Sequence, residues 1–340
     1  MVFILSKIYQ TLPQSVKNNS KVIELVQRFN NNNKLKELES HYRMLDIIFS
    51  SCQIKATGTT RDIQLLSLEL LRLLDNICQK HNITYWIDYG TLLGAHRHKG
   101  FVPWDDDMDI SMPRSDYEKF IKIFPEEINK TPELKENLII SKLTQPHTNY
   151  PEKANILDKA NNGTFILFFQ CATKKPYVHF DVFPKDYIED EGLTPDRNEK
   201  QTKLQIELRE KIENNTWTLQ EGLKTQREKL KHTDQKTDNL TDAIDGLHNN
   251  IHNRIYPTNT IFPLTQTEFE QYQFPTPQKI DQYLPLIYGP DYMHIPHIAL
   301  DHSTEDILRQ QYNNDTIRMN EDFQKMIKLL RKINDEYKNR

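Results

Sequence analysis

Polar and apolar residues alternate most clearly in residues 107–112, where the chain reads DMDISM. An apolar residue at every second position is typical of a strand with one buried face. Met108, Ile110 and Met112 are therefore expected in the core. Because residues two apart on a strand share a face, the pattern directs the Asp107 and Asp109 carboxylates to the same side.

A helix and a short strand are predicted upstream. Apolar residues spaced three and four apart in residues 61–82 predict a helix with a wide buried face. Residues 84–88 read as a strand, and Gly90 and Thr91 interrupt it before a second helix. A strand that turns through glycine into a helix presents backbone N–H groups and a hydroxyl at the helix start. That arrangement is an anion site.

Downstream, the same patterns predict one helix, over residues 114–124, and three strands, over residues 139–143, 164–171 and 177–184. In the third strand Val178, Phe180 and Val182 share one face, which puts His179 and Asp181 on the other.

Apolar residues at helical spacing recur in a charged, glutamine-rich region: Leu204, Leu208 and Ile212, then Leu240, Ile244, Leu247, Ile251 and Ile255. They predict two or three exposed helices that form a cap or an inserted hairpin. The predicted organisation is a helical N-terminal arm (1–60), a catalytic core (61–190), a helical insertion (191–255) and a C-terminal part of the catalytic domain with a helical tail (256–340).

Four carboxylates, those of Asp105, Asp106, Asp107 and Asp109, fall within five positions. Carboxylates this close repel one another unless a cation lies between them. Mg²⁺ or Mn²⁺ is the expected cofactor, because such cations take oxygen ligands and leave positions for substrate phosphates. An EF-hand is excluded, since Ile110 stands where that loop needs glycine. A P-loop motif is also absent.

Basic residues follow the predicted anion site by about two helical turns. Arg97, His98 and Lys99 are candidates to hold further phosphate oxygens, with Gly90 and Thr91 at the helix start.

Composition excludes some functions. The formal net charge of −4 gives no reason to expect nucleic-acid binding. Three widely spaced cysteines, Cys52, Cys78 and Cys171, fit neither a zinc site nor a disulfide framework, and we expect reduced thiols in the cytoplasm. The apolar start of the chain is too short to span a bilayer, so association with the inner membrane face is expected to be peripheral.

The run Asp88-Tyr-Gly-Thr-Leu-Leu-Gly-Ala-His-Arg-His-Lys-Gly-Phe-Val-Pro-Trp-Asp-Asp-Asp-Met-Asp-Ile resembles the signature of the LicD family, whose best-known members are phosphorylcholine transferases. Asp181-Val-Phe-Pro resembles a second element of that family. The resemblance covers roughly residues 61–302. It implies an α/β (α+β) fold, a nucleotidyltransferase-like mixed sheet with surrounding helices, to which this chain adds a helical insertion.

The resemblance also implies an activity. A phospho-alcohol, phosphocholine first, would pass from a CDP-alcohol donor such as CDP-choline to a hydroxyl of a cell-surface glycan acceptor. Asp107 and Asp109 would hold the metal and Asp181 would be the third acid. The expected supporting residues are Asp105, Asp106, His98, Trp104 and His179.

Other functions stay open. A true nucleotidyltransferase would use the same site, and the fukutin-related group of the family often uses CDP-ribitol. CDP-glycerol is a further donor of this type, and a glycosyltransferase with its own DxD motif comes third. The non-enzyme alternative is an inactive scaffold, although such proteins usually lose an acid and none is missing here.

Overall fold

The computed structural model describes residues 34–48, 54–141, 169–243, 254–295 and 304–338. The chain divides into two units. The smaller comprises residues 1–53 and 293–299; there a helix at residues 34–48 contacts the later segment, because Tyr42 donates to the Ile295 carbonyl and Asp46 lies 2.8 Å from His294. The larger unit, residues 54–292 and 300–340, contains the sheet and is described below.

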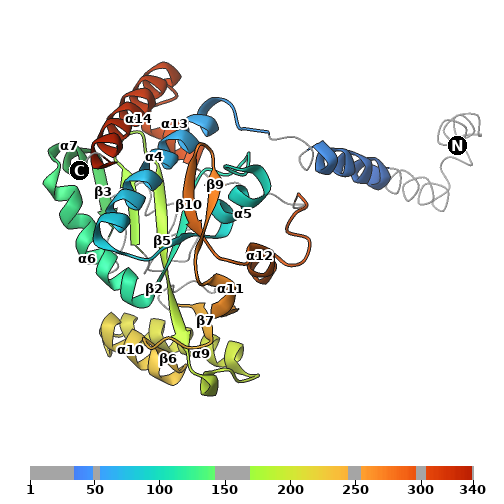
Figure 1. Ribbon diagram of the computed structural model, residues 1–340, viewed down its shortest axis with the longest axis vertical. Helices are drawn as coiled ribbons and strands as arrows, with labels where there is room; N and C mark the ends of the chain where they lie inside the picture. The colour runs from blue at the N-terminus through green and yellow to red at the C-terminus, as the bar shows by residue number, and fades with distance from the viewer. Residues whose placement is uncertain (1–33, 49–53, 142–168, 244–253, 296–303, 339–340) are drawn as a thin grey trace, which may run out of the picture. The chain divides into compact units, whose positions relative to one another are not determined.

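In the described residues, an eight-stranded mixed sheet forms the centre of the larger unit (Figure 1). Its main order is β1 (Trp86–Ile87), β2 (Asp109–Pro113), β5 (His179–Ile188), β4 (Phe169–Thr173) and β3 (Leu138–Ser141). The far end of β5 also pairs with β6 (His232–Thr233) and β7 (Asn239–Asp242), and β8 (Ile255–Pro257) pairs with β7. β2 and β5 are parallel, whereas the other pairs are antiparallel. The expected mixed α+β sheet is therefore confirmed.

Helices cover one face of the sheet. α4 (Gly58–His81) and α6 (Arg114–Lys130) contact β5, and α14 (Thr316–Lys338) packs along α4 (Figure 1). Phe124 of α6 meets Phe180 edge to face, with ring centroids 5.9 Å apart. Met108, Ile110 and Met112 are each fully buried, as their alternation predicted. Two short helices, α7 (Pro132–Asn137) and α13 (Thr304–Gln311), also belong to the larger unit.

The opposite side carries α5 (Tyr89–His98), which contacts β2, and α12 (Ile280–Tyr288), which contacts α5. A hairpin of β9 (Thr265–Phe269) and β10 (Tyr272–Thr276) lies against α5 and β1. The short helix α11 (Thr258–Ile261) directly follows β8.

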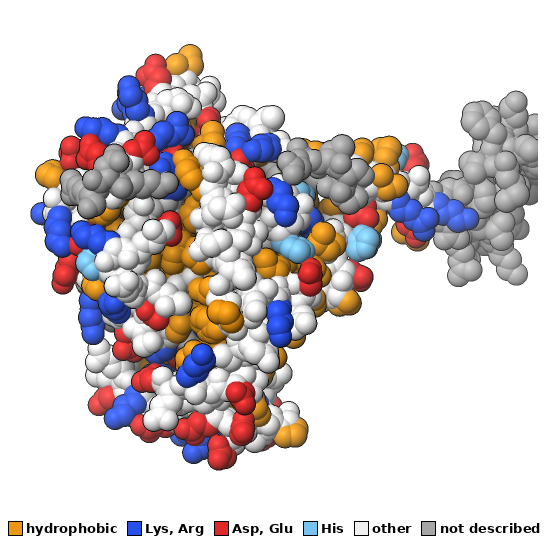
Figure 2. Space-filling model, in the orientation of Figure 1, with side chains coloured by type: hydrophobic (Ala, Val, Ile, Leu, Met, Phe, Trp, Pro, Cys, Tyr) orange, Lys and Arg blue, Asp and Glu red, His pale blue; other side chains and the backbone are white. Residues whose placement is uncertain are grey.

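The predicted helical insertion is only partly helical. α9 (Arg197–Glu213) and α10 (Leu219–Lys229) confirm its first half, after a short 3₁₀ turn at Asp190–Gly192. Ion pairs such as Lys203–Glu199 lie on its surface, and Figure 2 shows both charge signs mixed at this end of the molecule. These charges form a solvated face.

The helix predicted from the spacing of Leu240 to Ile255 is wrong at both ends. Residues 239–242 and 255–257 are strands β7 and β8 of the central sheet, and Leu240 pairs with Tyr187. A spacing of four also keeps side chains on one face of a strand, so it does not distinguish the two structures. Residues 244–253 lie outside the described residues, as do Cys52 and most of the predicted strand at 164–171.

Other predictions hold with shifted limits. The helix predicted at 114–124 continues through Pro125 to Lys130. The tail is helical in α13 and α14. Cys78 and Cys171 are free, buried thiols. Among helices in the described ranges, none combines the length and apolar character needed to cross a bilayer.

A buried ionic network attaches α6 and β6 to the far end of β5. Arg114 donates two hydrogen bonds to Asp186, at 2.7 and 3.2 Å, and the His232 ring lies 2.7 Å from the same carboxylate. Arg197 reaches His232 from α9 at 2.7 Å. Burial alone would raise the pKa of Asp186, but Arg114 and His232 outweigh it and lower that pKa far below its usual range. The helical segment is thus anchored to the sheet by charge as well as by packing.

Glu127 joins three helices, and we predict that it stabilises the fold only above mildly acidic pH. Lys80, Lys130 and His81 contact its carboxylate at 2.7, 2.5 and 3.0 Å, and Tyr337 lies at 3.4 Å. Burial alone would raise the pKa of Glu127, but these partners lower it to about 2. Because the folded pKa is depressed, the stabilisation is complete above the unfolded value of 4.5 and disappears as pH falls towards 2.

Glu127→Gln should therefore lower the free energy of unfolding at pH 7 by about 1–3 kcal/mol, typical of losing hydrogen bonds to a charged group. The difference from wild type should shrink as pH falls below about 4.5. Denaturant unfolding across this pH range measures it. Glu126→Gln, at the exposed neighbouring position, is the control. Identical pH profiles for the two variants would contradict the assignment.

Candidate active site

The register of the two parallel strands brings two predicted acids together. Asp109 begins β2 and is paired directly with Asp181 of β5. Paired residues on neighbouring strands point to the same face, so both carboxylates leave the sheet on the side opposite Ile110 and Val182. The Asp181 N–H donates to the Met108 carbonyl at 2.9 Å and fixes this end of the pairing. Gln170 of β4 donates to the Asp181 carboxylate at 2.9 Å.

The loop before β2 adds three more carboxylates. Ligand oxygens of Asp105, Asp106 and Asp107 lie within 4.8 Å of one another. Gln64 of α4 donates to the carbonyls of Asp105 and Val102, at 2.9 and 3.3 Å, and holds the loop. We call Asp105, Asp106, Asp107, Asp109 and Asp181 the acidic cluster.

Mutual repulsion is strong within the acidic cluster. The pKa of Asp109 is raised well above its usual range, first by burial and then by Asp107, Asp181 and Asp105. Burial also raises the pKa of Asp105, with Asp107 and Asp106 adding to it. Raised carboxyl pKa values in a group of neighbouring acids are typical of positions where a cation or a proton is taken up.

Gly90 is adjacent to the acidic cluster for a steric reason. A Cβ atom at Gly90 would lie 2.6 Å from Asp105 Oδ2 and 3.8 Å from Asp109 Oδ2. No side chain can replace its hydrogen without moving the Asp105 carboxylate. The glycine that sequence analysis assigned to a helix start thus makes room for the acids.

The start of α5 differs from the predicted open anion site. Asp88 is its N-cap, and the carboxylate accepts from the Tyr89 N–H at 2.8 Å. The Thr91 hydroxyl is buried and accepts from the Asp109 N–H at 2.9 Å. Both residues therefore hold the acidic cluster in place, and a phosphate-binding role for Gly90 and Thr91 stays a prediction.

A second buried network, which the sequence did not predict, lies next to the acidic cluster, four residues further along β5. Lys185 is fully buried, with its ammonium 2.5 Å from Asp242, 3.3 Å from Asp88 and 2.9 Å from the Tyr89 hydroxyl. Tyr283 also donates to Asp88, at 2.9 Å. Burial alone would lower the pKa of Lys185, but Asp242 and its neighbours outweigh it, and the pKa is raised. We call these groups the lysine network.

The predicted basic residues lie at the other end of α5. Arg97 donates to the Tyr292 carbonyl at 3.0 Å and lies 5.9 Å from the centre of the Trp104 ring. Its Nε–H donates to His98, whose pKa falls to about 4 because of burial and then of Arg97. Lys99 is exposed and ends the helix in a left-handed conformation. None of these contacts tests whether Arg97, His98 and Lys99 bind phosphate, so that role stays a prediction.

Two other side chains approach the acidic cluster. His179 Nε2 lies 3.9 Å from Asp181 Oδ2, which is too long for a hydrogen bond. Tyr288, which the sequence did not single out, is the last residue of α12. The pKa of its phenol is raised by burial and then by Asp109 and Asp105, so it faces the carboxylates.

The acidic cluster fits a divalent cation. It offers carboxylate oxygens from two strands and one loop, and these are ligands that Mg²⁺ and Mn²⁺ take. Two ligand sets share Asp107: the predicted pair with Asp109, and the loop trio with Asp105 and Asp106. We favour the pair with Asp181 beside it because two segments far apart in the sequence, residues 107–109 and β5, converge there. The loop trio consists of neighbours that are close by connectivity alone.

Comparison with known proteins gives a consistent result. Residues 82–221 match the family model described as LicD/FKTN/FKRP, nucleotidyltransferase domain. This match contains the whole acidic cluster. It is shorter than the expected 61–302, and it includes α9, which was expected to lie outside the resemblance.

Three relatives are each similar to part of this chain. The lipopolysaccharide cholinephosphotransferase LicD of Haemophilus influenzae is 31% identical over 140 residues, 39% of this chain and 46% of that protein. An uncharacterized protein of Rickettsia typhi is 27% identical over 44% of this chain and 43% of its own length. One of Rickettsia prowazekii is 36% identical over 24% and 30%. The chain thus spans less than half of each of these relatives.

Gly90→Ala should weaken cation binding without unfolding the protein. The added methyl must displace the Asp105 carboxylate, which lies 2.6 Å from its position. We expect the rise in melting temperature caused by Mn²⁺ to fall to less than half of the wild-type rise. Gly58→Ala is the control, because that glycine has a φ of 62° but no atom near its Cβ position. The control should lose stability yet keep the full Mn²⁺ effect; an unchanged Mn²⁺ effect in Gly90→Ala would argue against the steric role.

Proposed function

Because residues 82–221 match the nucleotidyltransferase-domain model of the LicD family, we propose that this chain transfers a phospho-alcohol from a CDP-activated donor to a hydroxyl of a cell-surface glycan. Phosphocholine is the first choice of cargo, since the Haemophilus influenzae relative is a lipopolysaccharide cholinephosphotransferase. The observation that carries the proposal is the acidic cluster, in which Asp109 and Asp181 are paired across parallel strands beside the Asp105–Asp107 loop.

The proposed reaction exchanges one phosphoester bond for another. The acceptor hydroxyl oxygen forms a bond to the phosphorus that carries choline. The bond from that phosphorus to the bridging oxygen of the pyrophosphate breaks, and CMP leaves with the electron pair. The hydroxyl proton passes to a carboxylate of the protein.

Asp107 and Asp109 would hold Mg²⁺ or Mn²⁺. When bound, this cation supplies positive charge to the donor pyrophosphate and to the negative charge that develops on the leaving CMP. The protein's own part is to position its carboxylates. The lysine network contributes to this because Lys185 contacts Asp88, and Asp88 caps the start of α5 beside the acidic cluster.

Asp181 is our candidate for the base that accepts the hydroxyl proton. Its carboxylate is partly exposed, at 14%, and is oriented by Gln170. Tyr288 of α12 lies close enough to Asp109 and Asp105 for their charges to raise the pKa of its phenol, and the residue is 42% exposed. An exposed aromatic ring beside the reacting centre also suits a quaternary ammonium group.

A second reaction uses the same residues. In nucleotidyl transfer the α-phosphorus of CTP would be attacked and pyrophosphate would leave. Donors with ribitol or glycerol in place of choline would keep the mechanism and change only the cargo. We place the reaction at the cytoplasmic face of the membrane, before the glycan is exported, as a further part of the proposal.

Asp107→Asn and Asp109→Asn should each abolish turnover and leave the fold intact. The pKa of Asp109 is raised on folding, so its ionised form destabilises the cation-free protein near pH 7. Removing that charge should keep the melting temperature level or raise it, and the Mn²⁺-induced rise should disappear. Thermal melts with and without Mn²⁺, beside a turnover assay, measure both effects.

The control for these variants is Asp190→Asn, which changes the same chemistry at an exposed position outside the acidic cluster. It should retain turnover and the Mn²⁺ effect. Wild-type activity in either cluster variant would remove that residue from the metal site.

The reaction itself is tested by nucleotide chromatography after incubation with CDP-choline, CDP-ribitol, CDP-glycerol, CTP or UDP-glucose, each with and without EDTA. We expect slow CMP release from CDP-choline by water attack, faster release when a glycan acceptor is added, and none with EDTA. Asp181→Asn should lower the rate about 10²–10⁴-fold, the usual effect of losing a general base.

Each outcome of this assay assigns a function. CMP from another CDP-alcohol alone would change the cargo and keep the mechanism. Pyrophosphate from CTP, without CMP from any CDP-alcohol, would establish nucleotidyl transfer instead. No cleavage of any donor in the presence of bound Mn²⁺ would favour the inactive scaffold.

A further inference from the structure

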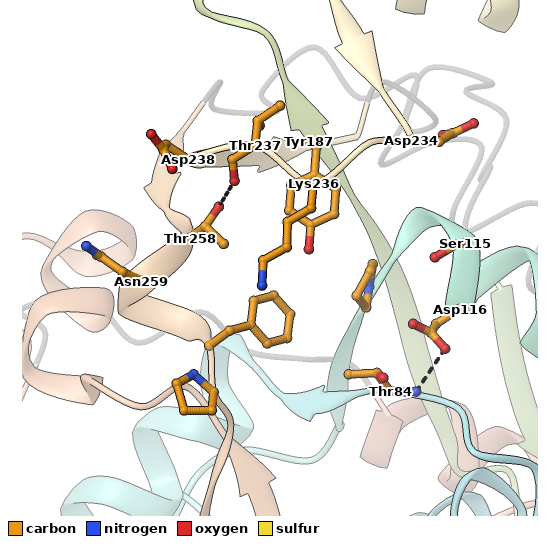
Figure 3. A pocket seen from close by; sticks show the side chains of 13 residues that line it. Thr84, Ser115, Asp116, Tyr187, Asp234, Lys236, Thr237, Asp238, Thr258 and Asn259 are labelled. Atoms are coloured by element: carbon orange, nitrogen blue, oxygen red, sulfur yellow. Dashed lines mark hydrogen bonds between the residues drawn. The ribbon is translucent and has the colours of Figure 1, made fainter.

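A groove of about 930 Å³ opens at the far end of the central strands (Figure 3). In Figure 3 the side chains of Tyr187 and Lys236 both extend into it, with Asn259 on one side and Ser115 and Asp116 on the other. Asp238 lies at its edge. Neither the family match nor the proposed reaction assigns a role to this groove.

Two residues that line the groove, Pro113 and Tyr187, lie on the strands that carry the acidic cluster and on the same face of them. Pro113 is four residues after Asp109 on β2, and Tyr187 is six after Asp181 on β5. Even separations keep side chains on one face of a strand. At about 3.3 Å per residue, the groove begins about 13–20 Å from the carboxylates. The fully buried Lys185 lies between them, so the groove is a separate site.

Its charge excludes the CDP-alcohol donor. Three carboxylates, those of Asp116, Asp234 and Asp238, line the groove against one ammonium, that of Lys236. Arg227 outside it pairs with Asp234 at 2.5 Å, which still leaves an excess of negative charge. A nucleotide or a free phosphate would be repelled.

The remaining chemistry suits a neutral, hydroxyl-rich ligand. Phe262 and Tyr187 supply aromatic surface, while Thr258, Asn259 and the carboxylates supply hydrogen-bonding groups. The Lys236 ammonium already lies 5.9 Å from the centre of the Phe262 ring, which disfavours a second cation such as choline there.

We propose that this groove binds the acceptor glycan through sugar residues distant from the hydroxyl that reacts. This inference rests on the proposed function for the class of ligand. Sugar rings would stack on the aromatic side chains, and their hydroxyls would donate to Asp116 and Asp238. One monosaccharide cannot reach both the groove and the acidic cluster, so the groove selects acceptors of several sugar residues.

Isothermal titration calorimetry of the full chain tests the binding without turnover. The probes are a deacylated lipopolysaccharide oligosaccharide, a teichoic-acid fragment, glucose, CMP with Mg²⁺, and choline chloride. At least one of the two oligomers should bind at millimolar concentration, and more tightly than glucose. CMP with Mg²⁺ should not displace it.

Variants locate the site. Asp238→Asn and Asn259→Ala change exposed residues, and each should weaken oligomer binding about tenfold, the effect of one lost hydrogen bond to a charged or neutral polar group. Tyr187→Ala should weaken it further, with a thermal melt to establish that it folds. Asp306→Asn, an exposed aspartate on α13, is the matched control and should bind as wild type does.

The inference is overturned if neither oligomer binds, if the groove variants bind as tightly as the control, or if choline or CMP is the ligand that the variants lose. Its failure is distinct from failure of the proposed function. CMP release from CDP-choline with unchanged oligomer binding in the groove variants would remove the groove alone. Loss of oligomer binding in those variants, without cleavage of any donor, would remove the proposed transfer alone.

Discussion

The parallel pairing of β2 with β5 is the constraint on which the site depends. It sets Asp109 opposite Asp181, so the two carboxylates project from adjacent strands. Neighbouring strands in a sheet are about 4.8 Å apart. Their repulsion acts against the folded state, and the raised pKa of Asp109 expresses it. The opposing stabilisation comes from the same strand, where Lys185 is buried against Asp242 and Asp88. The favourable and unfavourable charge interactions of the site thus both depend on how β5 pairs with its neighbours, β2 on one side and β7 on the other.

The alternation of polar and apolar residues predicts those parts of this arrangement that depend on neighbours in the sequence. The buried face of β2 and the position of Asp181 on a strand follow from alternation over a few residues. The register that joins them does not, because Asp109 and Asp181 lie 72 positions apart and carry no local signal of their pairing. Lys185 was missed for the same reason. A lysine between proline and aspartate reads as exposed, and its partner Asp242 lies 57 residues further along.

The two corrections share a physical origin in long-range contacts. Leu240 and its neighbours have a spacing that fits helix or strand, and pairing with β5 decides for strand. Asp88 was predicted as the last residue of a strand, yet its carboxylate caps α5 and also accepts hydrogen bonds from the hydroxyls of Ser111 and Tyr283. In both places the amino-acid pattern is compatible with two local structures, and the sheet selects one of them.

The charges of the acidic cluster and of the groove also determine which binding steps of the proposed reaction depend on one another. The acidic cluster and a pyrophosphate donor are both anionic, so the donor gains attraction there only with a cation between them. Donor affinity must then depend on cation concentration. The ligand inferred for the groove is neutral, and about 13 Å or more of strand and the buried Lys185 separate it from the cluster. Screening by salt also reduces interactions over such distances. Acceptor binding is therefore expected to be independent of the cation, which means that donor and acceptor can bind in either order once the cation is in place.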